Sequence, residues 1–483
     1  MSARTIAAAA LVALPLVTLS CTADAGDVLP GHSRPVFEHD WPHPRELEFE
    51  DGGFQPADPA RSLVVTAGGT RAWIIEDHAD PLALVMAAVP LGRQYEADGE
   101  AGAADVVVRL LGRRLSELLG AGAAAGVQVS QELDLTRLSV EVLAEDWLEA
   151  LTALVRTLRE PGLTPSAVGT PRAAGPPAGG GATRPVAELT RLVGRYPLAP
   201  PDSGIPVRPE SVRNLGERAL QPGTIVFGIA GGVAAADAEA ALNELTSAWT
   251  PPPGNMRATA RPATFAAART QADPLHTIDE PGFMSWLAVG HAMAPIERAD
   301  EAAVAVMAEI VNIRLNIETR EIRGLTNRAL LVLPAATDGA GLLHVRTSGR
   351  SESVGPLIRH SVEVLSRIRT EDGAPTDEEL QQAKGGLTLG RWQDSLDGAR
   401  RTAATYALET VRRGSLDHLM AWPAAVRAVT AEDVSAAARR YIDPGSLTAV
   451  VVGQIDAVRA ARHPRWPVTL EELPTLLRQA HRP

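Results

Sequence analysis

Hydrophobic residues recur along this chain with two different periods, and each period predicts one kind of element. Leu82–Val89 is wholly apolar, which is typical of a strand covered on both faces. Between 102 and 119 apolar side chains return at helical spacing and predict an amphipathic helix. Leu138, Val140 and Val142 alternate with polar residues, as in a strand with one buried face. Strands and helices therefore alternate here.

Further elements complete two similar series along the chain. They are predicted at 62–66, 71–76 (strands) and 146–160 (helix) in the first half, and at 284–289, 342–347 (strands), 301–317 and 354–369 (helices) in the second. Thr376 and Glu379 form a capping box that opens a further, long helix. Thr430 is a good N-cap for another helix. The order of elements is therefore shared by the two halves.

An internal repeat supports this duplication. Arg208–Val233 aligns with Thr430–Ile455 without a gap, at a constant offset of 222 residues. Each copy predicts a helix, a Pro-Gly turn and a strand that ends in Gly. Two common helix–turn–strand units that look alike are the alternative to duplication. The identical pairs are Glu210/Glu432, Val212/Val434, Arg218/Arg440, Pro222/Pro444, Gly223/Gly445 and Gly231/Gly453.

The N-terminus has the pattern of an export signal. Arg4 precedes an apolar run from 6 to 19, which is short for a membrane span. The run ends at Cys21, the only cysteine of the chain, in a pattern that resembles a bacterial lipoprotein signal. Cys21 is then the lipidation site and the chain is anchored to the cell envelope. Ala23–Ala25 offers an alternative A-x-A cleavage site, which would release a periplasmic or secreted protein.

Composition narrows the class of protein. The chain has 483 residues, of which 45% are hydrophobic and 22% are charged, as in a soluble globular protein with more than one domain. The net charge is −12, which argues against nucleic-acid binding because that function needs a basic surface.

Three segments of the second half carry a resemblance to a known family. They are Arg320–Leu325 (REIRGL), Pro375–Lys384 (PTDEELQQAK) and Thr430–Gly453. In order and spacing they resemble segments of the pitrilysin/insulinase family of zinc peptidases. The resemblance extends from about Ser62 to Val458 and is to the short two-domain form, similar to mitochondrial processing peptidase subunits. It implies an α+β fold with two duplicated α/β-sandwich domains, whose mostly antiparallel sheets are flanked by helices.

The predicted domain organisation follows from these signals. The parts are a signal (1–21), a tether (22–60), a first peptidase-like domain (61–255) with a Gly/Pro-rich insert (164–204), a linker (256–270), a second peptidase-like domain (271–462) and a C-terminal tail (463–483).

The zinc motif of the family is absent from this chain. Relatives carry H-x-x-E-H on the helix that begins near Gly102, and the corresponding residues here are Asp105, Val108 and Arg109. Asp105 could ligate a metal, whereas Val108 offers no ligand and Arg109 has no lone pair to give. A divalent ion beside Arg109 would also be repelled by its charge. We therefore expect no zinc and no other cofactor.

The third ligand of the family, a glutamate on a later helix, is also missing a clear counterpart. The region 164–201 is rich in proline and glycine and does not favour a long helix. Glu188 is its only acidic residue. It is either a remnant of the ligand or an ordinary solvent-facing residue of a short helix or loop.

The resemblance also implies a substrate-binding pair in the second half. Arg320 stands at the family's arginine position and Asn327 replaces the tyrosine. Arg320 either binds a peptide or pairs with a neighbouring acid. The chain is thus expected to lack activity alone and to be the heterodimer partner of an active zinc-bearing relative, contributing to peptide binding. The alternatives are a free-standing peptide-binding or scaffold protein and, less favoured, an autonomous zinc endopeptidase.

Overall fold

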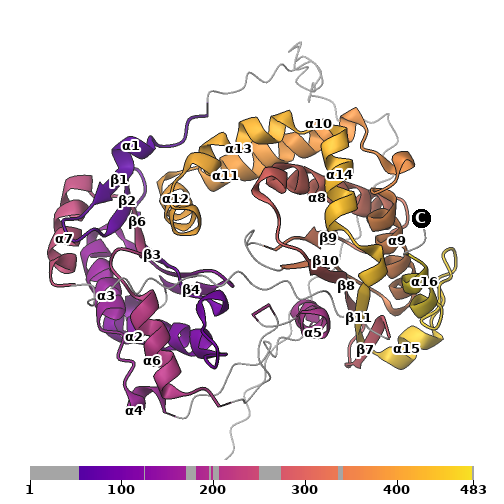
Figure 1. Cartoon of the computed structure of the whole chain (residues 1–483), viewed down its shortest axis with the longest axis horizontal. Coiled ribbons are helices and arrows are strands. Elements are labelled where there is room, and N and C mark those ends of the chain that lie inside the picture. Colours follow the sequence, from indigo (N-terminus) through magenta and orange to yellow (C-terminus); the bar gives the residue numbers. More distant parts are fainter. Residues whose placement is uncertain are drawn as a thin grey trace, which may run out of the picture. The chain divides into compact units, whose positions relative to one another are not determined.

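Two mixed β-sheets organise the chain (Figure 1). The computed structural model describes residues 54–123, 126–169, 181–194, 197–198, 206–249, 273–334 and 341–480. The predicted signal, the tether up to 53, Cys21 and the 256–270 linker lie outside the described residues. Gln55–Pro483 forms one compact unit.

The first sheet has six strands in the order β1-β2-β6-β3-β5-β4, and the second has five in the order β7-β11-β8-β10-β9. Their bounds are β1 Leu63–Val65, β2 Arg71–Glu76, β3 Leu82–Val89, β4 Val127–Gln131, β5 Thr136–Leu143, β6 Val226–Gly231, β7 Leu275–Asp279, β8 Ser285–Met293, β9 Ala329–Val332, β10 Gly341–Gly349 and β11 Thr448–Gly453.

The two sheets share one topology. Apart from β1, which has no counterpart, each strand of the first sheet has an equivalent at the same place in the second sheet. In both sheets the strand that comes last in the sequence of that half (β6 or β11) pairs parallel with an early strand (β2 or β7). The remaining pairs are antiparallel. Helices α6 (Pro209–Ala219) and α14 (Ala431–Tyr441), and strands β6 and β11, begin and end at the predicted 222-residue offset. The predicted fold class, with a duplicated sheet-and-helix unit, is confirmed.

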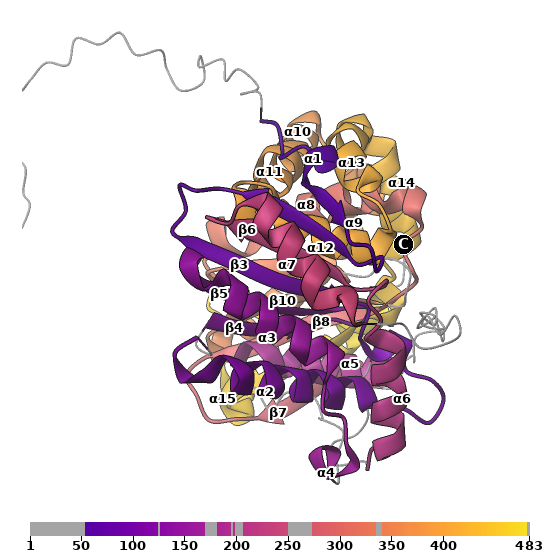
Figure 2. The ribbon, with the colours of Figure 1, turned by 90° about the vertical axis from the view of Figure 1, so that its left-hand side faces the viewer.

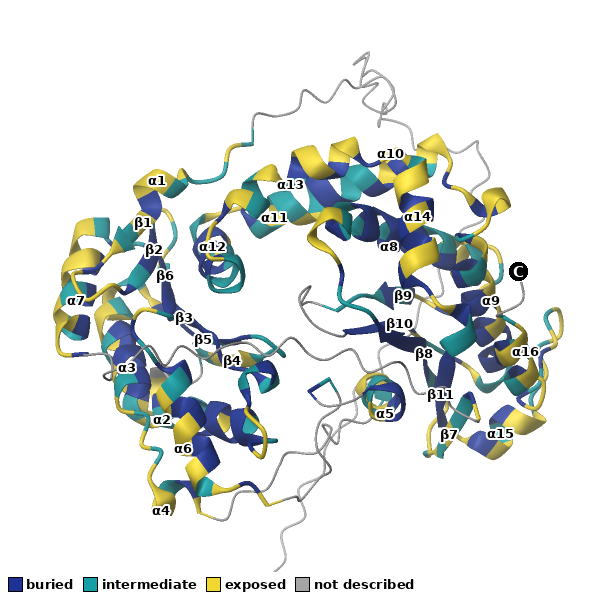
Figure 3. Cartoon of the chain, viewed as in Figure 1, coloured by how far each residue is buried: buried dark blue, intermediate teal, exposed yellow. Residues whose placement is uncertain are grey.

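Helices cover the outer face of each sheet. On the first sheet these are α2 (Ala103–Ala123), α3 (Trp147–Arg159), α6 and α7 (Ala235–Ser247), as Figure 2 shows. On the second they are α8 (Glu301–Asn316), α9 (Val354–Arg367) and α14. Alternate residues of the strands point toward these helices and are buried against them. A fully buried leucine on the helix side, such as Leu151 of α3, contributes about 1.5–3 kcal/mol to the free energy of folding. The central strands β3, β6, β8 and β11 are accordingly buried along almost their whole length, as Figure 3 shows.

The inner face of each sheet is covered by a helix from the other half. Helix α12 (Ala399–Arg413) packs on β2, β3 and β6 of the first sheet, and α5 (Arg184–Val193) packs on β8 and β11 of the second. Gly228 of β6 permits the close approach of α12, because a Cβ there would lie 3.0 Å from the carbonyl oxygen of Ala403. On the second sheet, Leu189, Leu192 and Val193 of α5 pack against β8, β10 and β11.

The remaining elements are short or connect these layers. They are α1 Pro59–Ser62, α4 Pro165–Val168, α10 Asp377–Gly385, α11 Gln393–Ser395, α13 Asp417–Ala428, α15 Ile455–Ala460 and α16 Leu473–Gln479, with the π-helical turn η9 Gly386–Trp392 joining α10 to α11. The long helix predicted after Thr376 is this α10–η9–α11 run. No described helix combines the length and the apolarity that a membrane crossing needs.

Three strands escaped the sequence prediction. β4, β7 and β9 are only four or five residues long; β4 and β7 mix polar with apolar positions, and β9 is a run of four apolar residues. Each lies at or near a sheet edge, where one face or one side stays partly exposed. Their pairing partners define them as strands, because their own period is too short to do so.

Candidate functional site

The first turn of α2 is the place where the family would carry its metal ligands. Glu96, 1% exposed, accepts the backbone N–H of Gly102 (3.1 Å) and of Ala104 (2.7 Å). These N–H groups have no partner within the helix, so the carboxyl group caps α2. Burial raises the pKa of Glu96 to about 8, although the two N–H bonds act in the opposite direction. Glu96 therefore positions the start of α2.

Asp105 is engaged in a polar cluster with two neighbouring elements. Its Oδ2 lies 3.2 Å from Nη2 of Arg93, and its Oδ1 accepts a hydrogen bond from Nε2 of Gln131 at 3.0 Å. Arg93 belongs to the 3-10 turn before α2 (Arg93–Tyr95), and Gln131 ends β4. The Asp105 side chain is 8% exposed. Both of its oxygens are therefore already satisfied by protein groups.

Val108 and Arg109 complete a donor set that does not fit zinc. Val108 is 7% exposed and belongs to the apolar core of the first half. Arg109 is exposed, and its side chain makes no hydrogen bond or ion pair with any described residue. Tetrahedral zinc requires Cys, His or carboxylate ligands, and these positions supply one carboxylate that is already bound. In the described ranges no group of three His, Cys, Asp or Glu side chains could hold a metal ion.

Glu188 lies in a different environment from Asp105. It sits on α5, 2.6 Å from Nη2 of Arg191, and the hydrogen bond from Arg191 lowers its pKa. The charges of His276 and Arg184 lower it further. Because α5 packs on the second sheet, the structure places Glu188 beside that sheet. In the first half, the counterpart of α10 is the four-residue helix α4.

The two substrate-binding candidates of the second half differ in surroundings. Arg320 lies in the π-helical turn Ile317–Glu321; its side chain is 59% exposed and its Nε is 3.5 Å from Glu321. The structure thus offers the neighbouring acid that the sequence left open as its partner. Asn327 lines a cavity of about 220 Å³ on the inner side of the second sheet, together with Trp286 and two arginines.

Sequence reasoning missed those two arginines, Arg328 and Arg346. Arg346 interrupts the apolar residues of β10. Leu343 and Val345 point into the core on the outer face of the sheet, so Arg346 points to the opposite, inner face. A charged residue on that face of a mostly buried strand was the sequence signal that could have indicated a binding site.

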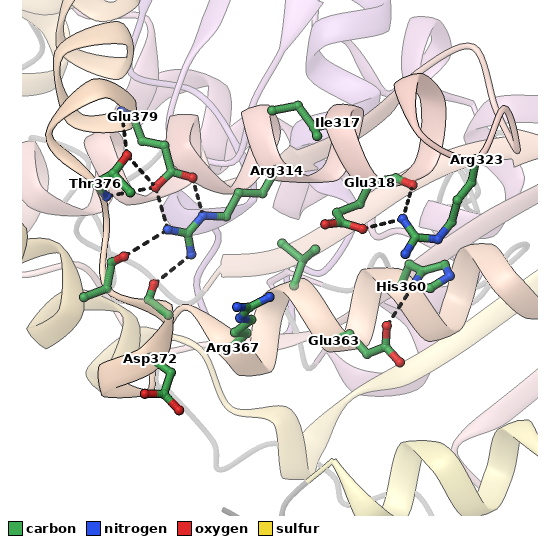
Figure 4. Close-up of a pocket in the computed structure, with 13 residues that line it drawn as sticks. Arg314, Ile317, Glu318, Arg323, His360, Glu363, Arg367, Asp372, Thr376 and Glu379 are labelled. Carbon is green, nitrogen blue, oxygen red and sulfur yellow. Dashed lines mark hydrogen bonds and ion pairs between the residues drawn. The ribbon is translucent and has the colours of Figure 1, made fainter.

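A second cavity, of about 460 Å³, lies on the outer, helical side of the second half (Figure 4). Ion pairs line it: Arg314 with Glu379 (2.7 Å), Arg323 with Glu318, and His360 with Glu363 (2.7 Å). The hydrogen bond from His360 is the largest cause that lowers the pKa of Glu363 to about 2.

The ion pairs of this outer cavity hold elements together. Arg314 of α8 also donates to the carbonyl oxygens of Gly373 (2.8 Å) and Ala374 (3.3 Å), which fixes the chain ahead of the α10 capping box. Opposite charges are nearly balanced around the cavity, so it offers little preference for a charged ligand. We attribute a structural role to its polar groups.

Comparison with solved structures identifies proteins with the same fold. No protein-family model matches the chain, and no curated protein matches it. Among solved structures, the peptidase M16 inactive domain from Pseudomonas fluorescens is similar, at 18% identity and a TM-score of 0.58, over 84% of this chain and 99% of that one. A protease from Helicobacter pylori is similar at 14% identity and a TM-score of 0.60, over 83% and 100%.

A chain of Complex III2 from Candida albicans is also similar, at 11% identity and a TM-score of 0.63, over 86% of this chain and 99% of that one. The chain therefore has the fold of the M16, or pitrilysin-type, peptidases along almost their whole length. The resemblance inferred from the sequence is confirmed at the level of the fold.

Proposed function

We propose that this chain is a non-catalytic protein built on the M16 peptidase fold, which binds peptides and acts as the partner subunit of an active zinc-bearing relative. The observation that carries the proposal is the state of the α2 site. Asp105 is bound by Arg93 and Gln131, while Val108 and Arg109 offer no ligand. One similar solved structure is itself named an inactive domain, and another is a chain of a multi-subunit complex.

In the part of the chain that the structure describes there is no metal ligand set that could activate a water for peptide hydrolysis. What the fold retains is a scaffold with exposed polar groups, including Arg320 and Asn327, beside the second sheet. In a heterodimer, such groups would bind part of a peptide while the partner cleaves it.

The first experiment measures zinc and cleavage. The purified chain is dialysed against zinc, its metal content is determined by elemental analysis, and cleavage of a quenched fluorescent peptide library is followed. We expect substoichiometric zinc and no cleavage. Stoichiometric zinc together with cleavage by the chain alone would contradict the proposal and favour an autonomous peptidase.

The second experiment tests the partner. The chain is co-expressed with a relative that carries H-x-x-E-H, preferably one encoded beside it, and complex formation and peptide cleavage are measured. We expect a stable complex whose cleavage rate exceeds that of the relative alone, and a lower rate with Arg320→Ala but not with the control Arg213→Ala on the exposed side of α6. If neither binding nor added activity is found, a free-standing binding or scaffold protein is the better description.

We also propose that the chain is exported and anchored through a lipid on Cys21, on the basis of the sequence pattern at its N-terminus. The Cys21→Ser variant should move from the membrane fraction to the soluble fraction of the cell envelope. Equal membrane retention of both forms would exclude Cys21 as the anchor.

A further inference from the structure

The inner cavity beside Asn327 lies where the cover of the second sheet ends. Strand β8 contributes Trp286, β9 contributes Leu330 and β10 contributes Arg346. Ala182, from the 3-10 turn Gly181–Thr183 that leads into α5, closes one side. The cavity is thus built from segments far apart in the sequence, and its volume of about 220 Å³ suits a side chain or a chain end.

Strand register determines which side chains face the cavity. Arg346 is opposite Leu330 of β9 and Ala288 of β8, and Ser348 is opposite Trp286. Ala288 and Trp286 pack in the cluster covered by α5. Since alternate residues of a strand share a face, Arg346 and Ser348 point to the inner face, just beyond the region that α5 covers.

Two features hold this cavity in shape. The carbonyl oxygen of Arg328 accepts hydrogen bonds from Thr347 Oγ1 (2.9 Å) and Thr326 Oγ1 (3.2 Å), so the backbone that carries its guanidinium is anchored. Gly181, at φ +67°, lies against the Trp286 indole, where an added Cβ would be 3.3 Å from a ring atom. Both the charged and the aromatic walls are therefore positioned before any ligand binds.

The charged side chains that line the cavity are all positive. Arg328 and Arg346 both line it, neither side chain makes a hydrogen bond or ion pair with a described residue, and no acidic side chain appears among its described lining residues. Two like charges that share a small cavity repel each other, and an anion between them removes this repulsion. This basic site is on a chain of net charge −12, so it stands apart from the general surface.

We propose that this cavity binds a carboxylate of a peptide, either an acidic side chain or the C-terminal carboxylate. Arg328 and Arg346 donate hydrogen bonds to the carboxylate oxygens, a geometry for which guanidinium groups are suited. Trp286 and Leu330 contact the apolar part of the same or the adjacent residue, and the Asn327 amide bonds the peptide backbone. The inference rests on the proposed peptide-binding function and names the class of peptide.

The test uses fluorescence anisotropy with the full chain and a short labelled peptide rich in glutamate. Two further peptides separate the sources of the carboxylate: one has an amidated C-terminus, and the other has glutamine in place of each glutamate. We expect Arg328→Ala and Arg346→Ala each to weaken binding about tenfold, as for loss of a hydrogen bond to a charged group. Binding should also weaken as salt is added.

Matched variants guard against unspecific effects. Arg213→Ala, an exposed arginine on α6, should leave the affinity unchanged. Arg346→Lys should restore part of it, because the charge remains while the bidentate geometry is lost. Arg328 and Arg346 are both exposed, so the thermal unfolding midpoint of each alanine variant should match that of the parent chain.

The outcomes separate this inference from the proposed function. Loss of binding with the amidated peptide assigns the C-terminal carboxylate, and loss with the glutamine peptide assigns the side chains. If a peptide that carries both alterations binds as tightly as the original, or if the double alanine variant keeps full affinity, the carboxylate site is wrong, while pairing with an active relative can still stand. If pairing fails but the arginine variants lose the peptide, the partner role is wrong and the site is retained.

Discussion

Helices α12 and α5 each cover the inner face of the sheet of the other half, but different interactions hold them there. Helix α12, of 15 residues, is attached to the first sheet at both ends: Arg400 lies 2.7 Å from Asp80, and Arg412 lies 3.0 Å from Asp134. Between these ends the Trp73 indole N–H donates to Thr410 at 2.9 Å. Helix α5, of 10 residues, packs on the second sheet through apolar contacts, and one ion pair, Arg184 with Glu280, ties its N-terminal end to the residue after β7.

This difference explains why part of the inner face is uncovered on the second sheet. Polar contacts at both ends of α12 close the inner face of the first sheet, in the half that carries Asp105, Val108 and Arg109. The shorter α5 leaves the far end of β8 and β10 uncovered, and the arginine-lined cavity lies there. A short crossing helix in one half is thus associated with an accessible site on the other half.

The largest effect is expected from the apolar anchor of α5. Leu189 is fully buried, so Leu189→Ala should lower the free energy of unfolding by about 2–5 kcal/mol or release α5 locally. Urea unfolding and hydrogen exchange of α5 measure the two possibilities. The control Leu389→Ala, at a side chain 62% exposed, should change stability by no more than about 0.5 kcal/mol. Equal effects of the two variants would show that α5 is not held by this contact.

The next effect concerns the charged anchor of α12. Arg412 pairs with Glu132 (2.5 Å) as well as Asp134, so Arg412→Ala should cost about 1.5–3 kcal/mol by leaving these carboxylates unpaired. Arg401→Ala on the same helix is the control, because its pair with Asp397 is 3.9 Å long and exposed. A double-mutant cycle with Asp134→Asn should give a coupling energy; a value of zero would mean that the ion pair does not hold α12.

A smaller effect depends on pH. His418 of α13 lies 2.7 Å from Glu301 of α8 and 3.4 Å from Glu409 of α12, and hydrogen bonds to these carboxylates raise its pKa to about 9. A raised histidine pKa means that its stabilisation is fully present below about pH 6.5 and is lost as the pH rises through about 9. Urea midpoints measured across this range should fall for the parent chain.

The variant His418→Gln should flatten that pH dependence, because no proton is then gained or lost at this position. The change should be smaller than that of Arg412→Ala, since a third of the His418 side chain is exposed and solvent screens its interactions. An unchanged pH profile in the variant would assign the dependence to another group.

The smallest effect extends the comparison to the two copies of the repeat. Thr430 caps α14 with a full capping box, whereas Arg208, at the matching place before α6, makes no side-chain cap. Thr430→Ala should therefore lower stability by about 1 kcal/mol, and Arg208→Thr should raise it by about 0.5–1 kcal/mol. Arg208→Ala should bring no gain. Thermal unfolding of the three variants checks whether capping is the difference between the copies.

The sequence by itself determined the repeated architecture, and it showed that two of the three motif positions on α2 carry side chains that cannot bind a metal. The apolar run at 82–89 and the repeat unit whose strand ends at Gly453 predicted buried strands, and the repeat offset matches the ends of α6 and α14 to the residue. Likewise, Val108 and Arg109 lack a ligand atom in any conformation, so their chemistry could be inferred before the fold was known.

Only the tertiary structure decided which distant groups meet. The exchange of α5 and α12, the binding of Asp105 by Gln131, and the convergence of Arg328 and Arg346 all join residues whose separation along the chain carries no local signal. Short edge strands such as β4 and β9 also depend on their neighbours for their hydrogen bonds. Local patterns determine which face of an element is apolar, whereas packing determines what covers that face and what is left open to bind.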